Sequence, residues 1–426
     1  MYRVRTRVSL SVFAQTFLWL GPGLVVAGTG TFIDRHAPDD LRVVSYNVLF
    51  ETIFPAVNPI QATKFGRVVR ALDPDGLNLQ EIRDHSADDV VGLLNAIAPL
   101  DQSETWFAHQ GDDNVIASKH PLSMTLTNTN PPKDGTAIAL VDLPNEEFDA
   151  DLYVINNYFT CCNTNVPPGP LDPNEQSRQW EADAIVSWMR DARTPGELVD
   201  LPNKTPMLVV GDLNIINIPS VLDPLGTLLT GDIFNERWFG ADSAPDWDGT
   251  SMADAHPLHN ASGPDDYTWR NDISQFAPGR LDYILYTNSV LRTANRFVLN
   301  TVDMTSDERL ATELSEFDIT VDLAGVTYDH LPLVTDFRLI KPGDYNDDGS
   351  VDGLDYATWR DHIGTPAGSL ANDVDGGVVG AARYQTWKAA FEAVSPPSPL
   401  TVPEPATARW FVWTSVVAMF LGAKRG

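Results

Sequence analysis

Apolar runs, each about as long as one β-strand, recur through the middle of the chain. They are LRVVSYN (41–47), GLNLQE (76–81), NVIASK (114–119), TAIALVDL (136–143), LYVINNYF (152–159), MLVVGDLN (207–214), RLDYILY (280–286) and PLVTDFRLI (332–340). Several are β-branched and apolar at successive positions, which is typical of strands buried on both faces. Segments 63–72 and 178–192 instead repeat apolar residues at helical spacing. Many strands with interspersed helices predict a layered α/β fold.

Several of these predicted strands end on polar residues. The run 207–210 is followed by Gly211, Asp212 and, one residue later, Asn214. Because side chains alternate along an extended chain, Asp212 and Asn214 are expected on the same side, at the strand end where α/β sheets commonly hold ligands. A strand followed by an Asx-type turn is the alternative for this stretch. The other polar residues at predicted strand ends are Asn47, Glu81, Asn156, Tyr158, Asp282, Asp329 and His330.

Composition limits both the architecture and the partners. With 426 residues, of which 43% are hydrophobic, the chain can bury the core of one large domain and still carry a smaller module. Its formal net charge of -29 at pH 7 repels polyanions, which disfavours tight, non-specific nucleic-acid binding through a basic surface. The two cysteines, Cys161 and Cys162, are adjacent, so no disulfide framework exists and stability must come from the core.

The pattern divides the chain into four segments. Residues 1–30 place three arginines before an apolar stretch and small residues, the layout of a secretory signal peptide; a buried N-terminal helix is the alternative. A body at 38–340 contains the strand-like runs, and a short acidic module occupies 343–394. A Pro-rich linker opens the tail at 395–426.

Five short motifs follow one another through the body. They are SYN (45–47), LQE (79–81), GDLN (211–214), RLDYIL (280–285) and DHLPLV (329–334). In these motifs and their order the body resembles the endonuclease/exonuclease/phosphatase superfamily, which includes pancreatic-type deoxyribonucleases, abasic-site endonucleases, bacterial sphingomyelinases and inositol-phosphate phosphatases. The resemblance implies that 38–340 forms an α/β domain, a four-layer sandwich of two facing mixed β-sheets flanked by helices, with the site at one edge.

The resemblance assigns a divalent metal site to the polar strand ends. Glu81 would be the principal ligand, and Asn47 and Asp329 would complete or orient the site. A small number of hard oxygen ligands suits Mg²⁺, which keeps several water molecules and binds phosphate directly. The expected catalytic cofactor is therefore Mg²⁺, or Mn²⁺ in its place.

The resemblance also assigns the catalytic groups. Asp212 would position or deprotonate the attacking water, and Asn214 would hydrogen-bond a phosphoryl oxygen or orient that water. His330, held by Asp282, would stabilise negative charge on the phosphate or transfer a proton, because a carboxylate partner fixes the imidazole tautomer and raises its proton affinity. One position departs from the family pattern: many members carry a histidine where this chain has Tyr158, whose phenol could donate to the phosphate.

These assignments predict a metal-dependent hydrolase of phosphate esters, with a phosphodiesterase or nuclease as the leading expectation. A sphingomyelinase-like phospholipase or a phosphomonoesterase is the alternative within the same fold, although those branches generally keep the histidine that Tyr158 replaces. A non-catalytic, surface-displayed binding module is the alternative from another class; such a module would tolerate the loss of catalytic residues that are all present here. The expected substrate is a nucleic acid, a phospholipid head group or a small phosphodiester.

The acidic segment DYNDDGSVDGLDY (344–356) fits a calcium-binding loop. Residues with oxygen ligands stand at the required positions, namely Asp344, Asn346, Asp348, Ser350, Asp352 and Asp355, with Gly349 at the sharp turn. A disordered Asp/Gly-rich linker is the alternative, but helical spacing follows in YATWRDHIG.

A second, degenerate copy of this loop begins at Asn372. Aligning Tyr384 with Tyr356 puts Val374, Gly376 and Arg383 where ligands belong, so weak or absent calcium binding is expected there. A duplicated calcium loop with a following helix resembles a type I dockerin. The resemblance implies a small α-helical dockerin-like module at 343–394, with Ca²⁺ in its first loop and a cohesin-like partner.

The tail at 402–426 joins a Pro-Glu-Pro signal to an apolar stretch and two terminal basic residues. The apolar stretch is shorter than the ~20 residues of a full membrane span. It resembles the Pro-Glu-Pro C-terminal sorting signal of certain Gram-negative bacteria, which is cleaved during export; a plain C-terminal anchor is the alternative. Both place the protein outside the cell or at the envelope surface of a Gram-negative-type bacterium, with export and sorting machinery as partners.

Overall fold

The computed structural model describes residues 28–101, 104–128, 135–145, 147–161, 171–215, 221–271, 276–319 and 329–394. By its internal contacts the chain separates into two compact units, Met1–Ile340 and Lys341–Gly426. Nearly all of the predicted signal peptide, and the whole predicted tail from residue 395, lie outside the described residues. Across the described ranges, no helix combines the length and the apolar character that a membrane span requires.

The first six-stranded sheet contains the N-terminal strands and the last strand of the body. In spatial order it runs β11 (Leu291–Val298), β12 (Leu333–Leu339), β1 (Leu41–Asn47), β2 (Gly76–Gln80), β4 (Asn114–Ser118) and β3 (Phe107–Gly111). The β1–β2 pair is parallel, and the other neighbours are antiparallel. The sheet is therefore mixed, with its parallel pair at the centre.

The second six-stranded sheet repeats this plan. Its order is β5 (Leu122–Asn128), β6 (Thr136–Val141), β7 (Leu152–Tyr158), β8 (Met207–Asp212), β10 (Asp282–Tyr286) and β9 (Ala253–Asp254). Here β7 and β8 form the parallel pair. Both sheets thus place two parallel strands at the centre, so that the carboxyl ends of each pair meet at one edge.

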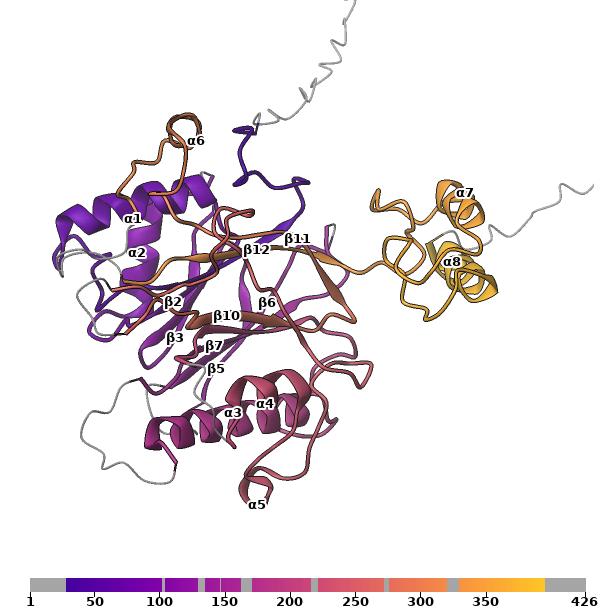
Figure 1. The fold of residues 1–426 in the computed structure, drawn as a ribbon, viewed down its shortest axis with the longest axis horizontal. Helices are drawn as coiled ribbons and strands as arrows, with labels where there is room; N and C mark the ends of the chain where they lie inside the picture. The colour runs from indigo at the N-terminus through magenta and orange to yellow at the C-terminus, as the bar shows by residue number, and fades with distance from the viewer. Residues whose placement is uncertain are drawn as a thin grey trace, which may run out of the picture. The chain divides into compact units, whose positions relative to one another are not determined.

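Helices cover the outer faces of the two sheets, as Figure 1 shows. α1 (Pro59–Leu72) and α2 (Ala87–Ile97) lie on one side, and α3 (Pro173–Ala192), α4 (Pro224–Thr230) and α5 (Glu236–Phe239) lie on the other; α6 (Ser306–Thr312) follows β11. α1 begins where the sequence favours a start, because Asn58 caps the Gln61 amide and Pro59 occupies the first turn. The predicted four-layer α/β sandwich is confirmed.

Alternation along β8 shows how the layers are filled. Leu208 and Val210 belong to the apolar core between the two sheets, whereas Met207 and Val209 pack with Ile185 of α3 in a second core. A central strand covered on both faces needs apolar residues at every position, which is why Met207 to Val210 carry no polar side chain. The same alternation directs Asp212 to the side of Leu208 and Val210, between the sheets.

Buried polar contacts also join the two sheets. The side-chain amide of Gln80 in β2 donates to Oδ1 of Asn156 in β7 over 2.7 Å, and Asn156 Nδ2 donates to the carbonyls of Leu79 and Val115. Because unpaired polar groups are costly between sheets, these contacts favour one alignment of the sheets. Gln80 and Asn156 therefore form a buried polar contact between the two sheets, close to the strand ends.

The second unit contains α7 (Gly353–Asp361) and α8 (Ala381–Val394), each preceded by an acidic loop. Its small apolar core consists of Tyr345, Leu370 and Val379, with Trp359 and Trp387 packed against it. Asp352 caps α7 by accepting from the Leu354 amide.

Candidate active site

Strand register brings the predicted polar residues to one edge of the sandwich. The strand pairs align Asn47 with Gln80, Tyr158 with Asp212, and Asp282 with Asp212. His330 lies just before β12, whose Leu333 pairs with Ser45 near the end of β1. Residues far apart in sequence are thus neighbours because parallel strands end together and an antiparallel strand begins where its partner ends.

The carboxamide of Asn47 joins two of the candidate site carboxylates. Its Nδ2 donates to Oε1 of Glu81 and to Oδ2 of Asp212, each over 3.1 Å, while its Oδ1 accepts from the Leu49 amide over 3.1 Å. Asn47 and Asp212 are each 1% exposed, and Glu81 is 8% exposed. One amide group therefore links a carboxylate of the first sheet to a carboxylate of the second.

Glu81 reaches this position through a left-handed backbone conformation. Gln80 points between the sheets, so a continued strand would direct Glu81 to the opposite face. Instead Glu81 adopts a φ of 64°, which is uncommon for a residue with a side chain. Its Oε2 then accepts from the Phe50 amide over 2.8 Å, while its Oε1 accepts from the side-chain amide of Asn47. Such conformations persist at functional sites, where the surroundings hold them in place.

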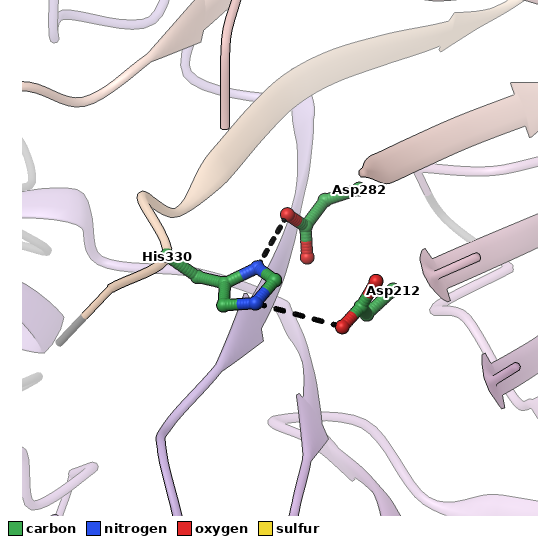
Figure 2. A group of neighbouring side chains, drawn as sticks. All are labelled: Asp212, Asp282 and His330. Atoms are coloured by element: carbon green, nitrogen blue, oxygen red, sulfur yellow. Dashed lines mark hydrogen bonds and ion pairs between the residues drawn. The ribbon is translucent and has the colours of Figure 1, made fainter. Parts of the chain in front are cut away.

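His330 lies between two buried aspartates (Figure 2). Its Nδ1 donates to Oδ2 of Asp282 over 2.7 Å, and its Nε2 lies 3.6 Å from Oδ2 of Asp212. The Thr268 hydroxyl accepts from the Asp282 amide over 3.0 Å and fixes the start of β10. The imidazole is therefore held from both nitrogens.

The two aspartates determine the protonation of His330. Burial by itself lowers the pKa of His330, but the Asp282 and Asp212 carboxylates outweigh burial and raise that pKa to about 10. Burial raises the pKa of Asp212 to about 7, against the opposing effect of the His330 charge. A doubly protonated imidazolium has no lone pair to give to a metal ion, so we interpret the Asp212, Asp282 and His330 group as a proton-handling unit.

The hydroxyl of Tyr158 donates to Oε1 of Glu81 over 3.0 Å. Burial, together with the Glu81 and Asp212 charges, raises the pKa of Tyr158 far above its usual value, so the phenol stays protonated. Tyr158, the residue that departs from the family pattern, thus donates a hydrogen bond to Glu81, the candidate metal ligand.

Asn214 and Asp329 lie near the group but turn to other partners. Asp212 Oδ1 accepts from the Asn214 amide over 3.0 Å, which is the Asx-type turn considered from the sequence. Asn214 Nδ2 donates to the Phe159 carbonyl, and Asp329 Oδ2 accepts from the Trp269 indole over 3.0 Å. The strand ends at Asp212, and Asn214 adopts a left-handed backbone conformation with a φ of 48°, so strand alternation does not determine the side on which Asn214 lies.

The donor set at this edge fits a hard divalent cation. Glu81 offers carboxylate oxygens and Asn47 an amide oxygen, the ligand types that Mg²⁺ prefers. The carboxylates of Glu81, Asp212 and Asp282 outnumber the single imidazolium of His330, which leaves excess negative charge at a buried edge. Among the described residues, Oδ1 of Asp282 is a buried acceptor without a hydrogen-bond donor. A bound cation would offset this charge.

Comparison with protein families settles the membership of the chain. The model of the endonuclease/exonuclease/phosphatase family matches residues 44–307, which is more than half of the chain. The chain belongs to the endonuclease/exonuclease/phosphatase family. It is accordingly an enzyme that hydrolyses phosphate ester bonds, in a family whose enzymes use divalent metal ions.

Solved structures of other proteins resemble this chain only distantly. A humanised zebrafish (D. rerio) TDP2 has 13% identity and a TM-score of 0.43, and the match covers 70% of this chain and 99% of that one. The human Nocturnin catalytic domain has 15% identity and a TM-score of 0.43, covering 71% and 95%. An endonuclease/exonuclease/phosphatase from Bacteroides vulgatus has 13% identity and a TM-score of 0.42, covering 70% and 99%. Comparison with curated proteins gives no match.

Several supporting contacts of this edge could not be predicted from the sequence. The Phe50 amide that holds Glu81 is a backbone group, which any residue would supply, so no residue type could reveal it. Thr268 lies in the YTWR segment and supports Asp282 through its hydroxyl; the segment is visible in the sequence, but the pairing is not. Trp269, its neighbour, holds Asp329.

Proposed function

We propose that this family member is an exported, Mg²⁺-dependent phosphodiesterase or nuclease that hydrolyses phosphate esters by direct attack of an activated water. One observation carries the proposal: the Asn47 amide joins Glu81 to Asp212, while His330 lies within 3.6 Å of the same Asp212 oxygen. A metal-binding carboxylate, a base and a cationic donor thus converge on one edge. Each of these elements assists in-line displacement at phosphorus, through charge neutralisation, activation of the water or stabilisation of the transition state.

Glu81 would hold Mg²⁺, or Mn²⁺, as the principal ligand, and Asn47 and Asp329 would complete or orient the site. The cation, when bound, neutralises negative charge on the phosphate ester. Asp329 would have to exchange its contact with the Trp269 indole to act as a ligand, or orient the site through that indole. Tyr158 donates to Glu81 and would keep this carboxylate in place.

Asp212 is the proposed general base. Its Oδ2 would accept a proton from the attacking water as the water oxygen forms its bond to phosphorus, and the electron pair of the breaking ester bond would pass to the leaving oxygen. Burial poises the pKa of Asp212 at about 7, close to the value at which a base works best in neutral solution. Asn214 would orient the water or donate to a phosphoryl oxygen.

His330 is the proposed cationic donor. Asp282 fixes its Nδ1, and the proton on Nε2 is directed at the edge where Asp212 lies. This proton would stabilise the negative charge of the pentavalent transition state or pass to the leaving oxygen. Tyr158 could add a phenolic donor to the phosphate when it is released from Glu81.

Tyr158 favours a diesterase or nuclease over the phospholipase and phosphomonoesterase alternatives. Those branches of the family generally carry a histidine at this position, as do many members, whereas a phenol is compatible with the nuclease branch. The proposed substrate class is a nucleic acid or another phosphodiester, with a phospholipid head group as the alternative. The net charge of -29 argues for a short or small substrate over long, non-specifically bound DNA.

The outer segments would determine where this enzyme acts. Residues 1–30 are the proposed signal peptide, and the Pro-Glu-Pro tail is the proposed sorting segment at the cell envelope. The unit from Lys341 would be a dockerin-like module with Ca²⁺ in the loop from Asp344 to Asp355 and a cohesin-like partner.

The test is a substrate panel with purified protein and Mg²⁺, containing single- and double-stranded DNA, RNA, sphingomyelin and inositol phosphates. Hydrolysis of a nucleic acid that stops on addition of EDTA, and that is absent in Glu81→Ala, is the expected result. Turnover of sphingomyelin or of phosphomonoesters alone would favour the alternatives. No turnover of any phosphate ester would contradict the proposal.

A further inference from the structure

The second unit consists of two corresponding halves, each with a loop and a following helix. Trp359 Nε1 in the first half donates to the Gly380 carbonyl over 2.9 Å, and Trp387 Nε1 in the second half donates to the Asp352 carbonyl over 2.8 Å. The two tryptophans are 28 residues apart, and so are the two carbonyls. This reciprocal pair of hydrogen bonds establishes how the two halves correspond, without using the calcium-ligand positions of either loop.

By the same 28-residue offset, Arg383 in the second loop corresponds to Asp355 in the first. Asp355 is fully buried, and its carboxylate accepts from the amides of Tyr345, Asn346 and Asp352. In the first loop the final position thus carries a carboxylate directed inward, as a calcium loop requires. In the second loop a cationic side chain stands at this position.

The guanidinium of Arg383 lies inside the second loop. It donates six hydrogen bonds, two of which form a fork onto the Asp373 carboxylate, with Nε to Oδ1 and Nη2 to Oδ2 at 3.0 Å each. The remaining four go to backbone carbonyls of the loop, those of Asp375, Gly376, Gly377 and Val378. Arg383 and the Asp373 side chain are 1% and 2% exposed, respectively.

This arrangement has the character of a cation site. Its acceptors are a carboxylate and inward-directed carbonyl oxygens, including that of Val378, which corresponds to the carbonyl position supplied by Ser350 in the first loop. All five N–H groups of a guanidinium can be satisfied by such a set, and the Asp373 fork compensates its charge. A divalent cation cannot share this space with the guanidinium, because both would occupy the same oxygens.

We infer that the guanidinium of Arg383 is the resident cation of the second loop, which is therefore held closed without Ca²⁺ and binds none. Calcium dependence is then confined to the loop from Asp344 to Asp355. The claim that only the first loop depends on calcium rests on the calcium site proposed there. The claim that Arg383 holds the second loop closed does not rest on that site.

Hydrogen exchange of the full chain, read by mass spectrometry in EGTA and in CaCl₂, tests this inference. In the wild type, peptides within 373–382 should be protected equally in both conditions. Arg383→Met keeps the length of the aliphatic stem and removes the charge, and it should lower the protection of those peptides on the order of a hundredfold or more, because Asp373 is left buried and unpaired. Arg360→Met is the matched control: this arginine pairs with Asp361 on the surface of α7 and should change nothing.

The two loops touch at the ends of the second loop, because Asn372 Nδ2 donates to the Asp344 carbonyl and the Tyr345 hydroxyl donates to the Arg383 carbonyl. The second loop is therefore read in peptides that lie between these two residues, within 373–382. Calcium-dependent protection of those peptides in the wild type would overturn the inference, and so would unchanged protection in Arg383→Met. Absence of any calcium response in 344–355 would refute the proposed first site and leave the result for Arg383 standing. Peptides of the catalytic domain show in the same experiment that the rest of the variant is folded.

Discussion

Nδ1 of His330 donates to Oδ2 of Asp282 over 2.7 Å, and both side chains are buried. The two residues lie 48 positions apart, on the segment that precedes β12 and at the start of β10. Together with the Asp212 charge, this contact raises the pKa of His330 and keeps the imidazole cationic, although burial alone would lower that pKa. It follows that the charge of His330 depends on Asp282.

Replacing this partner should therefore change the pH dependence of hydrolysis. The pKa of His330 is raised to about 10, so the cationic donor is present below that pH and is lost as pH rises through it. Asp282→Asn removes a charge that raises this pKa, so the alkaline limb of kcat should move toward neutral pH. A full pH profile of both proteins is the measurement; an alkaline limb at the same pH would show that His330 does not control it.

Tyr158→Phe should weaken metal use without unfolding the protein. The hydroxyl holds Oε1 of Glu81, and loss of such a support for a metal ligand costs about 10–100-fold in metal affinity or activity. We expect a higher Mg²⁺ concentration for half-maximal activity, measured by Mg²⁺ titration of the rate. Tyr153→Phe is a matched control, since that phenol bonds to Trp188 away from the site. Equal Mg²⁺ dependence of both variants would show that the Tyr158 hydroxyl does not support Glu81 as a metal ligand.

The first sheet should depend on a buried ion pair between β1 and β12. Nε and Nη2 of Arg42 donate to the two Asp336 oxygens over 2.6 and 2.7 Å, with both side chains at most 3% exposed. Asp336→Ala leaves the guanidinium buried without its partner and should cost about 3–5 kcal/mol of unfolding free energy. The half-exposed pair of Arg190 with Asp191 offers a control: Asp191→Ala should cost no more than about 1 kcal/mol. Chemical denaturation of both variants measures the difference.

Calcium should order the first loop of the second unit. Asp344 accepts from the amides of Asp348 and Gly349, so its side chain already points into the loop. Asp344→Ala should abolish the calcium-induced protection of 344–355 in hydrogen exchange, while Glu392→Ala, on the surface of α8, should retain it. Persistent protection in Asp344→Ala would show that the calcium-dependent loop lies elsewhere.

Much of the fold could be predicted from the sequence because central strands are short, apolar and interrupted by clear turns. The runs ending at Asn47 and Asp212 form β1 and β8 as expected. β3, β5, β9 and β11 were missed. β5 (LSMTLTN) shows the alternation of a half-buried strand and could have been predicted. β3 is only partly buried, β9 has two residues, and β11 carries polar residues and a bulge between Thr293 and Asn295. Whether such a segment forms a strand depends on its hydrogen bonding to a neighbouring strand, and a single sequence does not show which strands pair.

The site was predictable in its residue types and only partly in its contacts. Strand ends identified Asn47, Asp212 and Asp282, because alternation and register place them together. The position of Glu81 depends on a left-handed backbone conformation and on the Phe50 amide, neither of which has a signature in residue type. Arg383 is a similar case: its position predicted a missing ligand, but only the structure shows that its guanidinium lies inside the loop.

The proposed mechanism requires Asp212 to activate water at a phosphorus atom bound on this edge. The most direct measurement is the Mg²⁺-dependent rate of hydrolysis of bis(p-nitrophenyl) phosphate by the wild type and by Asp212→Asn, with exposed Asp248→Asn as the control. We expect measurable wild-type turnover that the control retains and that Asp212→Asn lowers on the order of 10²–10⁴-fold, the usual contribution of a general base. A folded Asp212→Asn protein with the wild-type rate would contradict this mechanism.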